Sequence, residues 1–476
     1  MDKEELWKRA LSVTQIPNEF KPVIREYVEG ESGKGEAMFS WTNEEQDEGI
    51  TVKLDLAGNL TSLSIDLNNK IQDKTLLKDV KRKELAEQFL LQHYPDALNT
   101  LTFDRTTKHK DVFRFHYEQL FMDLPLRHAG CFIGVDSVGN IIQFTYKGVK
   151  VTPRIPQELI AKEKLDDHVR NKLDFNLTIT NLFTSLHNVK KDGLRLVYDI
   201  APYFLKYKAD VLKPTLTVTH EAVVPETLLS LPTLSNSIEH DYLTINEIVG
   251  ITNDMEILRE VDMGTETGIV WREKGWEIKE DDLSMDGFLK RQSEDTVKAV
   301  ICNKTGKVKS FIWFKARKGK LQLSREACYK KAIEFLQTKA PNYYQYLKLI
   351  VQDTEEEDTT RMKESFTFQI HNGQGIPVQT EIVIVAVNRT TGQIDYYSGP
   401  SFDIADITHI PAKPSISKEE AKEIFLNHLD FELAWDTDYE SEKYSQALVY
   451  QACDRHTRTP IRYIDVITGE VIVDIS

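Results

Sequence analysis

The second half of the 476-residue chain repeats the pattern of the first half, at an offset of roughly 230 to 256 residues. Phe39–Trp41 corresponds to Ile269–Trp271, and the helical segment Glu84–Tyr94 corresponds to Glu326–Thr338. Further pairs follow in the same order: Val52-Lys53 with Val297-Lys298, Phe113–Tyr117 with Phe366–Ile370, Leu124-Pro125 with Ile376-Pro377, Phe132–Asp136 with Ile384–Asn388, Leu173–Leu177 with Leu429–Leu433, Leu196–Tyr198 with Leu448–Tyr450, and Lys208–Val211 with Tyr463–Val466.

So many matches in one order indicate an internal duplication rather than chance similarity. We place the first half at residues 1–216 and the second half at residues 241–476. Residues 217–240 have the composition of a connector, because Pro225, Pro232 and a polar run interrupt any regular element.

Each half shows helices followed by strands that alternate polar and apolar residues and are joined by short glycine turns. Such turns connect antiparallel strands, whereas parallel strands need long crossovers. The sequence therefore predicts an α+β fold of tandem duplicated halves, with helices packed on small antiparallel sheets.

The charge balance opposes several partner classes. The chain has 60 Lys+Arg and 75 Asp+Glu residues, which gives a net charge of −15. Nucleic acid and anionic membranes attract clustered positive charge, so both are excluded as partners. The nearest approach to a basic cluster is Lys78, Lys81, Arg82 and Lys83 at a helix start, which we interpret as a solvated face.

The amino-terminal residues show no signal-peptide pattern, and no apolar run is long enough to cross a membrane, so a cytoplasmic location is expected. Cys131, Cys302, Cys328 and Cys453 lie far apart without metal-ligand spacing. They are predicted to be reduced structural thiols.

Sequence motifs for catalysis, phosphate binding and calcium binding are incomplete in this chain. His220-Glu221 lacks the second histidine of a zinc peptidase, and Gly30–Gly35 lacks the lysine–hydroxyl end of a phosphate loop. Asp436–Glu440 begins like a calcium loop, but its sixth position is Ser441, so an acidic solvated loop is the interpretation. Glu355–Asp358 reads as a charged hairpin tip.

The remaining candidates have structural interpretations. His116 lies in an alternating strand and His428 at a helix end, where packing or capping is expected. Trp41, Trp271 and Trp276 are predicted to anchor sheet faces, with an exposed binding platform as the alternative. The sequence thus nominates no catalytic residue, no cofactor-binding residue and no metal ligand.

The carboxy-terminal pattern resembles the PepSY domain. Ser417 and Glu420 form a capping-box pair before a helix, and the segment from Tyr463 to Ile472 follows the Y-x-D-x-x-T-G-E-V hairpin pattern. The whole duplicated chain is similar to the YcdB/YcdC repeated-domain family. The resemblance implies PepSY-like modules that bind, inhibit or regulate a peptidase and have no activity of their own.

Three hypotheses follow. The preferred one is a non-enzymatic protein- or peptide-binding module that uses sheet edges and a concave surface between the halves. The second is an enzyme or small-molecule-binding protein with a site in the cleft between the halves. The third is a structural protein of the cell envelope or spore. The sequence leaves the oligomeric state open.

Overall fold

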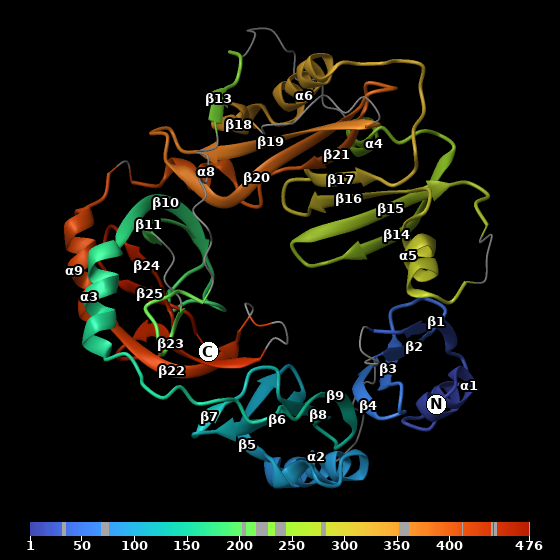
Figure 1. Ribbon diagram of the computed structural model, residues 1–476. Coiled ribbons are helices and arrows are strands. Elements are labelled where there is room, and N and C mark those ends of the chain that lie inside the picture. The colour runs from blue at the N-terminus through green and yellow to red at the C-terminus, as the bar shows by residue number, and fades with distance from the viewer. Residues whose placement is uncertain are drawn as a thin grey trace.

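The computed structural model describes residues 1–30, 35–67, 76–201, 206–215, 227–233, 244–277, 282–351, 361–411, 413–438, 441 and 445–475. Its units are arranged in a ring, with the amino-terminal strands on one side and the carboxy-terminal strands on the opposite side (Figure 1). Most strand pairs are antiparallel; Ile179 and Val378 join β10 to β20 in a parallel pair.

Each half begins with a four-stranded antiparallel meander. The first half has α1 (Lys3–Leu11), β1 (Lys21–Val28), β2 (Glu36–Thr42), β3 (Gly49–Asp55) and β4 (Leu60–Asp66). The second half has α4 (Ile245–Val249), β14 (Met255–Asp262), β15 (Glu266–Glu273), α5 (Met285–Ser293), β16 (Thr296–Cys302) and β17 (Val308–Trp313). The predicted duplication is therefore visible in the strand order, and α5 is an addition within the second copy.

A helix and a second set of strands extend each meander. In the first half these are α2 (Asp79–His93), η2 (Ala97–Asn99), β5 (Leu101–His109), β6 (Val112–Phe121), β7 (Leu124–Pro125), β8 (Gly130–Asp136) and β9 (Ile141–Gly148). In the second half they are α6 (Arg325–Lys339), α7 (Pro341–Tyr344), β18 (Leu347–Val351), β19 (Lys363–His371), β20 (Pro377–Asn388), β21 (Ile394–Ser398) and α8 (Ile404–Thr408). β4 pairs with β9, and β17 pairs with β21, so the two strand sets of each half form one continuous sheet.

The third segments of the two halves exchange strands. The third segment of the first half contains α3 (Lys162–Lys172), β10 (Asp174–Leu182), β11 (Gly193–Ala201) and β12 (Lys206–Lys208), and β13 (Thr227–Ser230) follows it. The third segment of the second half contains α9 (Lys418–His428), β22 (Leu429–Thr437), β23 (Gln446–Asp454), β24 (Ile461–Asp465) and β25 (Val471–Val473). β12 of the first half pairs with β23, and β24 of the second half pairs with β11. Each half therefore completes a sheet of the other.

Reciprocal contacts accompany this exchange. The Tyr198 hydroxyl donates to the Ile416 carbonyl at 3.2 Å, and the equivalent Tyr450 hydroxyl donates to the Ile160 carbonyl at 2.9 Å. The ion pairs are duplicated as well: Lys162 lies 3.2 Å from Asp430, and Lys418 lies 2.6 Å from Asp174. The two third segments are thus related by an approximate twofold arrangement.

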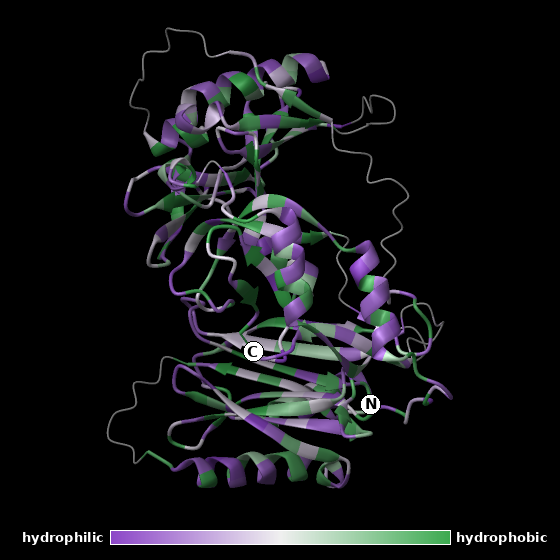
Figure 2. Ribbon diagram, turned by 90° about the vertical axis from the view of Figure 1, so that its left-hand side faces the viewer, coloured by the Kyte–Doolittle hydropathy of each residue, from purple (hydrophilic) through white to green (hydrophobic). Residues whose placement is uncertain are grey.

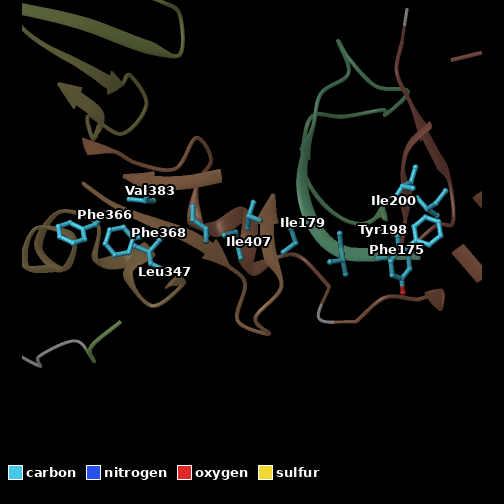
Figure 3. Close-up of a cluster of buried hydrophobic side chains, with 14 of the residues drawn as sticks. Phe175, Ile179, Tyr198, Ile200, Leu347, Phe366, Phe368, Val383 and Ile407 are labelled. Carbon is cyan, nitrogen blue, oxygen red and sulfur yellow. The ribbon is translucent and has the colours of Figure 1, made fainter. Parts of the chain in front are cut away.

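The apolar core follows from these pairings. Buried residues form one cluster from the second half's sheet through α8 to the third segments; Figure 3 shows Phe366 and Phe368 at one end and Phe175 and Tyr198 at the other. The first half's meander and its extension hold a second cluster that includes Phe39 and Phe144. Polar and apolar residues alternate along α2, the helix at the foot of Figure 2, because only one side of it packs on the sheet.

Several local predictions are confirmed. Helices occupy α2 and α6 as predicted, and Ser417 and Glu420 form the capping box of α9. The last strand is β25, after a turn with Gly469 at φ 73°. Most of the connector at 217–240 lies outside the described residues; the part at 227–233 contains β13, which pairs with β18.

Candidate peptide-binding edges

The ends of the sheets are treated differently in the two halves. β1 and β5 end the first sheet, β14 ends the second sheet, and β18 would be the equivalent of β5. β13 covers the outer edge of β18, with Thr227 opposite Val351 and Ser230 opposite Lys348. A strand from elsewhere in the chain therefore already extends one of these edges.

The edge of β1 is covered in a different way, by the segment that leads into α5. The Arg25 amide donates to the Leu283 carbonyl at 2.6 Å, and the Met285 amide donates to the Glu26 carboxylate at 2.7 Å. The Arg291 guanidinium donates to the Val23 carbonyl at 2.9 Å. This contact joins the two halves on the side of the ring opposite the exchanged strands (Figure 1).

β14 is an open edge. It pairs with β15 on one side, and in the described part of the chain no strand pairs with its other side. Only Met255 of this strand is buried. Large apolar side chains are exposed along it and just after it: Ile257 is 56% exposed, Leu258 54%, Val261 38% and Met263 53%.

The outer amides of β14 follow from the alternation of the backbone. The Met263 amide donates to the Glu266 carbonyl across the hairpin at 2.8 Å, so it points toward β15. Successive residues of a strand point their amide and carbonyl groups to opposite sides, and the amide of Glu260 therefore points away from the sheet. An extended segment alongside β14 would find a donor there.

β5 is another edge that no strand covers in the described residues, but its side chains oppose pairing. It carries Asp104, Arg105 and Lys108, and a bulge interrupts its register between Phe103 and Thr106. Charges and bulges are devices by which natural sheets block added strands. On the neighbouring strand, His116 contacts the Thr107 hydroxyl at 2.9 Å.

A cavity of about 520 Å³ lies where the halves exchange strands. Its walls come from residues 154–158, before α3, and from the regions of β12 and of β22 and β23. The charged groups of the lining are Arg154, Glu158, Lys208, Asp210 and Asp438. The Lys208 Nζ atom lies 3.4 Å from the Asp438 Oδ1 atom. The lining therefore combines both charge signs and both halves.

A second cavity, of about 340 Å³, lies within the second half beside α7. Cys302, Lys309 and Tyr343 are among its lining residues. The Tyr343 hydroxyl donates to the Phe402 carbonyl at 2.8 Å, and Lys309 forms an ion pair with Glu266. These polar groups are thus engaged within the protein.

The expected calcium-like loop has a different structure. Asp436 belongs to β22 and is 8% exposed, so the prediction of an acidic solvated loop is wrong for this residue. Its carboxylate lies 2.5 Å from Lys206 and 3.3 Å from Arg127. Both bases come from the first half, so this carboxylate joins the halves. Tyr439 and Glu440 lie outside the described residues.

The basic cluster at the start of α2 is only partly solvated. Lys81 pairs with Glu84 at 2.8 Å on the surface, as a solvated face requires. Arg82 is 6% exposed, and its guanidinium lies over the Phe113 ring at 3.7 Å from the centroid. The prediction is therefore wrong for Arg82, because helical spacing puts it on the same buried face as Ala86 and Leu90.

The tryptophan and histidine interpretations are mostly confirmed. Trp41 and Trp271 are each 3% exposed and anchor equivalent places in the two sheets. Trp276 is only half-buried, with the Arg272 guanidinium stacked 3.9 Å from its ring centre. His428 ends α9, and its Nδ1 lies 2.7 Å from Asp454.

The four cysteines are free thiols. Burial raises the pKa of Cys131 to about 12 and that of Cys453 to about 11. Hydrogen bonds with Thr305 lower the pKa of Cys302, which is more exposed. Among the described residues, no group of three or more His, Cys, Asp and Glu side chains is placed to hold a metal ion.

Other sequence candidates lie outside the described residues: His220-Glu221, most of the Gly30–Gly35 turn, and Glu355–Asp358. Within the described part of the chain, no helix has both the length and the apolar character needed to span a membrane.

The fold defines a duplicated protein of mixed helices and antiparallel sheets, and comparison with known proteins gives its family. The YcdB, YcdC repeated domain matches residues 3–148 and 239–401, and the chain belongs to this family. Both matched regions cover the two strand sets of a half and stop before its third segment.

Two relatives in Bacillus subtilis (strain 168) match along nearly their whole length. The uncharacterized protein YcdB is 30% identical over 99% of this chain and 98% of its own. The uncharacterized protein YcdC is 28% identical over 92% of this chain and 93% of its own. Among solved structures, the Bacillus megaterium YpeB C-terminal domain aligns with 45% of this chain and 95% of its own, at 11% identity and a TM-score of 0.26.

The sequence predicts binding by sheet edges, but it does not identify which residues form the open edge. The alternation in Met255–Asp262 marks a strand, but it carries no information about which neighbours the strand has. Comparison of the two copies does not single out β14 either, because its counterpart β1 (Lys21–Val28) is no less apolar.

Proposed function

We propose that this protein is a non-enzymatic binding protein that takes up an extended segment of another polypeptide along the outer edge of β14. The observation that carries the proposal is the open edge of β14 with its exposed Ile257, Leu258, Val261 and Met263. Exposed apolar edge strands invite pairing with another chain, and natural sheets normally block or cover them.

The chain itself supplies two precedents for covering such edges. β13 adds a strand to β18. On β1, the Leu283 carbonyl before α5 accepts from the Arg25 amide, and the Arg291 side chain of α5 donates to the Val23 carbonyl. β5 lacks a cover in the described residues but carries charges and a bulge. Of the sheet ends β1, β5, β14 and β18, β14 is the one that combines an open backbone with exposed apolar side chains, so it is suited to strand addition.

The class of partner that we propose is a peptidase or its substrate segment. This step rests on the PepSY-like pattern of the capped helix α9 and the final hairpin β24–β25, because modules of that type are associated with peptidase inhibition. An extended segment is also the form in which peptidases bind polypeptides, and a sheet edge presents the same hydrogen-bonding groups.

A second candidate function is small-molecule binding in the cavity where the halves exchange strands. Its volume of about 520 Å³ is within the range of ligand sites, and its lining offers charged groups of both signs. This candidate is favoured because the lining residues come from both halves. Ligand sites often lie where different parts of a fold meet.

The test of the main proposal uses peptides selected from a random display library on the full-length protein. Replacing Glu260 by proline removes the outward amide, and proline is tolerated at edge positions. Glu260→Ala is the matched control, because it removes the same carboxylate and keeps the amide. Loss of one hydrogen bond with its acceptor left unsatisfied costs about 1 to 3 kcal/mol, so we expect binding to weaken about 5- to 150-fold in Glu260→Pro.

Glu260→Ala is expected to retain most of the affinity. Equal binding by the wild-type protein and Glu260→Pro would show that the edge of β14 is not used. Thermal unfolding of both variants checks that the sheet remains intact.

A further inference from the structure

β1 and β14 occupy equivalent places in the two halves, and both contain a β-bulge. Pro22 pairs with Trp41 and the register then shifts, so that Ile24 pairs with Ser40. Ile257 pairs with Trp271 and the register shifts in the same way, so that Arg259 pairs with Val270. A bulge is a fixed structural feature, and its recurrence aligns the two strands residue by residue. Val23 therefore corresponds to Leu258, and Arg25 corresponds to Glu260.

The covered strand shows which backbone groups the open strand offers. On β1 the Val23 carbonyl accepts from the Arg291 guanidinium, and the Arg25 amide donates to the Leu283 carbonyl. The equivalent groups of β14 are the Leu258 carbonyl and the Glu260 amide. An occupant of β14 thus needs one carbonyl acceptor and one strong donor, and a guanidinium is the donor that the chain uses at the equivalent place.

The charges on the two edges are opposite at two equivalent positions, and β14 also carries the exposed Arg259 where β1 has Ile24. Lys21 and Arg25 of β1 correspond to Glu256 and Glu260 of β14, so two basic positions in one copy are acidic in the other. Glu256 and Glu260 are exposed, and neither forms an ion pair within the described residues. Glu256 pairs with Arg272 and Glu260 pairs with Ile269, so the two carboxylates lie on opposite faces of the sheet, and a bound segment would meet one of them on each face.

We infer that the segment bound on β14 is basic, with an arginine that donates to the Leu258 carbonyl and a positive charge on each face, one near Glu256 and one near Glu260. The occupant is an extended segment of another protein, because α5 already lies on β1. This inference rests on the proposed function of β14, and it adds the chemistry of the partner. Arginine suits the site because its planar fork binds carbonyl and carboxylate oxygens at the same time.

The experiment measures binding of two labelled peptides to the full-length protein by fluorescence anisotropy. Both peptides have about ten residues, alternating valine and threonine, which is a typical strand length. One carries arginines at positions on both faces of the strand, and the other carries glutamates at the same positions. We expect the arginine peptide to bind at least about tenfold more tightly, with the difference shrinking as salt is raised.

Two charge-reversal variants test whether the preference for the arginine peptide depends on Glu256 and Glu260. E256K/E260K is expected to lose at least about tenfold in affinity for the arginine peptide and to gain affinity for the glutamate peptide. E44K/E45K is the control, because it makes the same change of net charge at exposed positions in the β2–β3 turn. It is expected to bind the arginine peptide like the wild type, apart from a small uniform effect of net charge.

The inference is overturned if both peptides bind equally, if E256K/E260K leaves the preference unchanged, or if neither peptide saturates up to about 1 mM. It is also overturned if sedimentation shows a dimer that E256K/E260K abolishes, since the occupant would then be a second copy of this chain. Equal binding of both peptides with loss of both in Glu260→Pro would leave the proposed function standing and refute the basic partner alone.

Discussion

The exchange of strands between the halves predicts that the two halves bind each other when they are separate polypeptides. Co-expressed fragments of residues 1–215 and 227–476 are expected to co-purify, because each supplies a strand to a sheet of the other. Removing the Tyr198 and Tyr450 hydroxyls with Tyr198→Phe and Tyr450→Phe breaks one hydrogen bond in each direction of the exchange.

The expected loss of affinity between the two fragments follows from these two hydrogen bonds. A hydrogen bond within a protein contributes about 1 kcal/mol net, so the double variant is expected to weaken association by about 2 kcal/mol, or about 30-fold. The assay is titration of one labelled fragment with the other. Tyr343→Phe is the matched control, because it removes a tyrosine hydrogen bond of 2.8 Å that lies wholly within the second half.

The control is expected to lower the stability of its own fragment and to leave the association constant unchanged. Fragments that elute separately, or an equal loss of affinity in Tyr343→Phe and in the double variant, would refute the exchanged arrangement.

Three further predictions concern individual groups. Asp395 is 0% exposed and forms an ion pair with Arg317, so Asp395→Ala is expected to lower the free energy of unfolding by about 3 to 5 kcal/mol in denaturant titrations. Asp254→Ala, which removes an exposed ion pair with Lys315, is the control and is expected to change it little. Burial acts to raise the pKa of Asp430, but hydrogen bonds, that from Arg458 first, hold it at about 2. The Asp430 carboxylate therefore contributes stability above its unfolded pKa of about 3.9, and this contribution is lost as the pH falls toward 2. Asp430→Asn should flatten that part of the pH profile of fragment association, and an unchanged profile would contradict the assignment. Alkylation by iodoacetamide should modify Cys302 first, since burial raises the pKa of the other three thiols; mass spectrometry that finds Cys131 modified first would count against this order.

The repeat and its local elements were predictable from the sequence. Helical spacing marked α2 and α6, alternation marked the hairpins β8–β9 and β20–β21, and the pair Ser417 and Glu420 marked the start of α9. These features depend on residues close together in the chain, and propensity and periodicity report such features directly.

The exchange of strands was not predictable in the same way. The apolar stretch Leu448–Tyr450 marks a buried strand, but it does not say whether the partner strand comes from the same copy or from the other. Strands from two copies with similar sequences offer nearly equivalent pairings, and only the connections and the reciprocal contacts decide between them.

Burial of charged side chains was the other error. Arg82 and Asp436 were interpreted as solvated because charged residues are usually exposed. Each is buried against a partner distant in the sequence, Phe113 for Arg82 and Lys206 for Asp436. The open edge of β14 was missed for the same reason, since exposure of a strand edge depends on what the rest of the chain covers.

Hydrogen exchange of single amides, followed by NMR, tests the role of the β14 edge most directly. In the free protein, the Arg25 amide should be protected, because it donates to Leu283, while the equivalent Glu260 amide should exchange freely. On addition of a peptide selected on the protein, the Glu260 amide should become protected while the amides of β5 stay unchanged. A Glu260 amide that is already protected in the free protein, or that remains unprotected when the peptide is bound, would contradict the account.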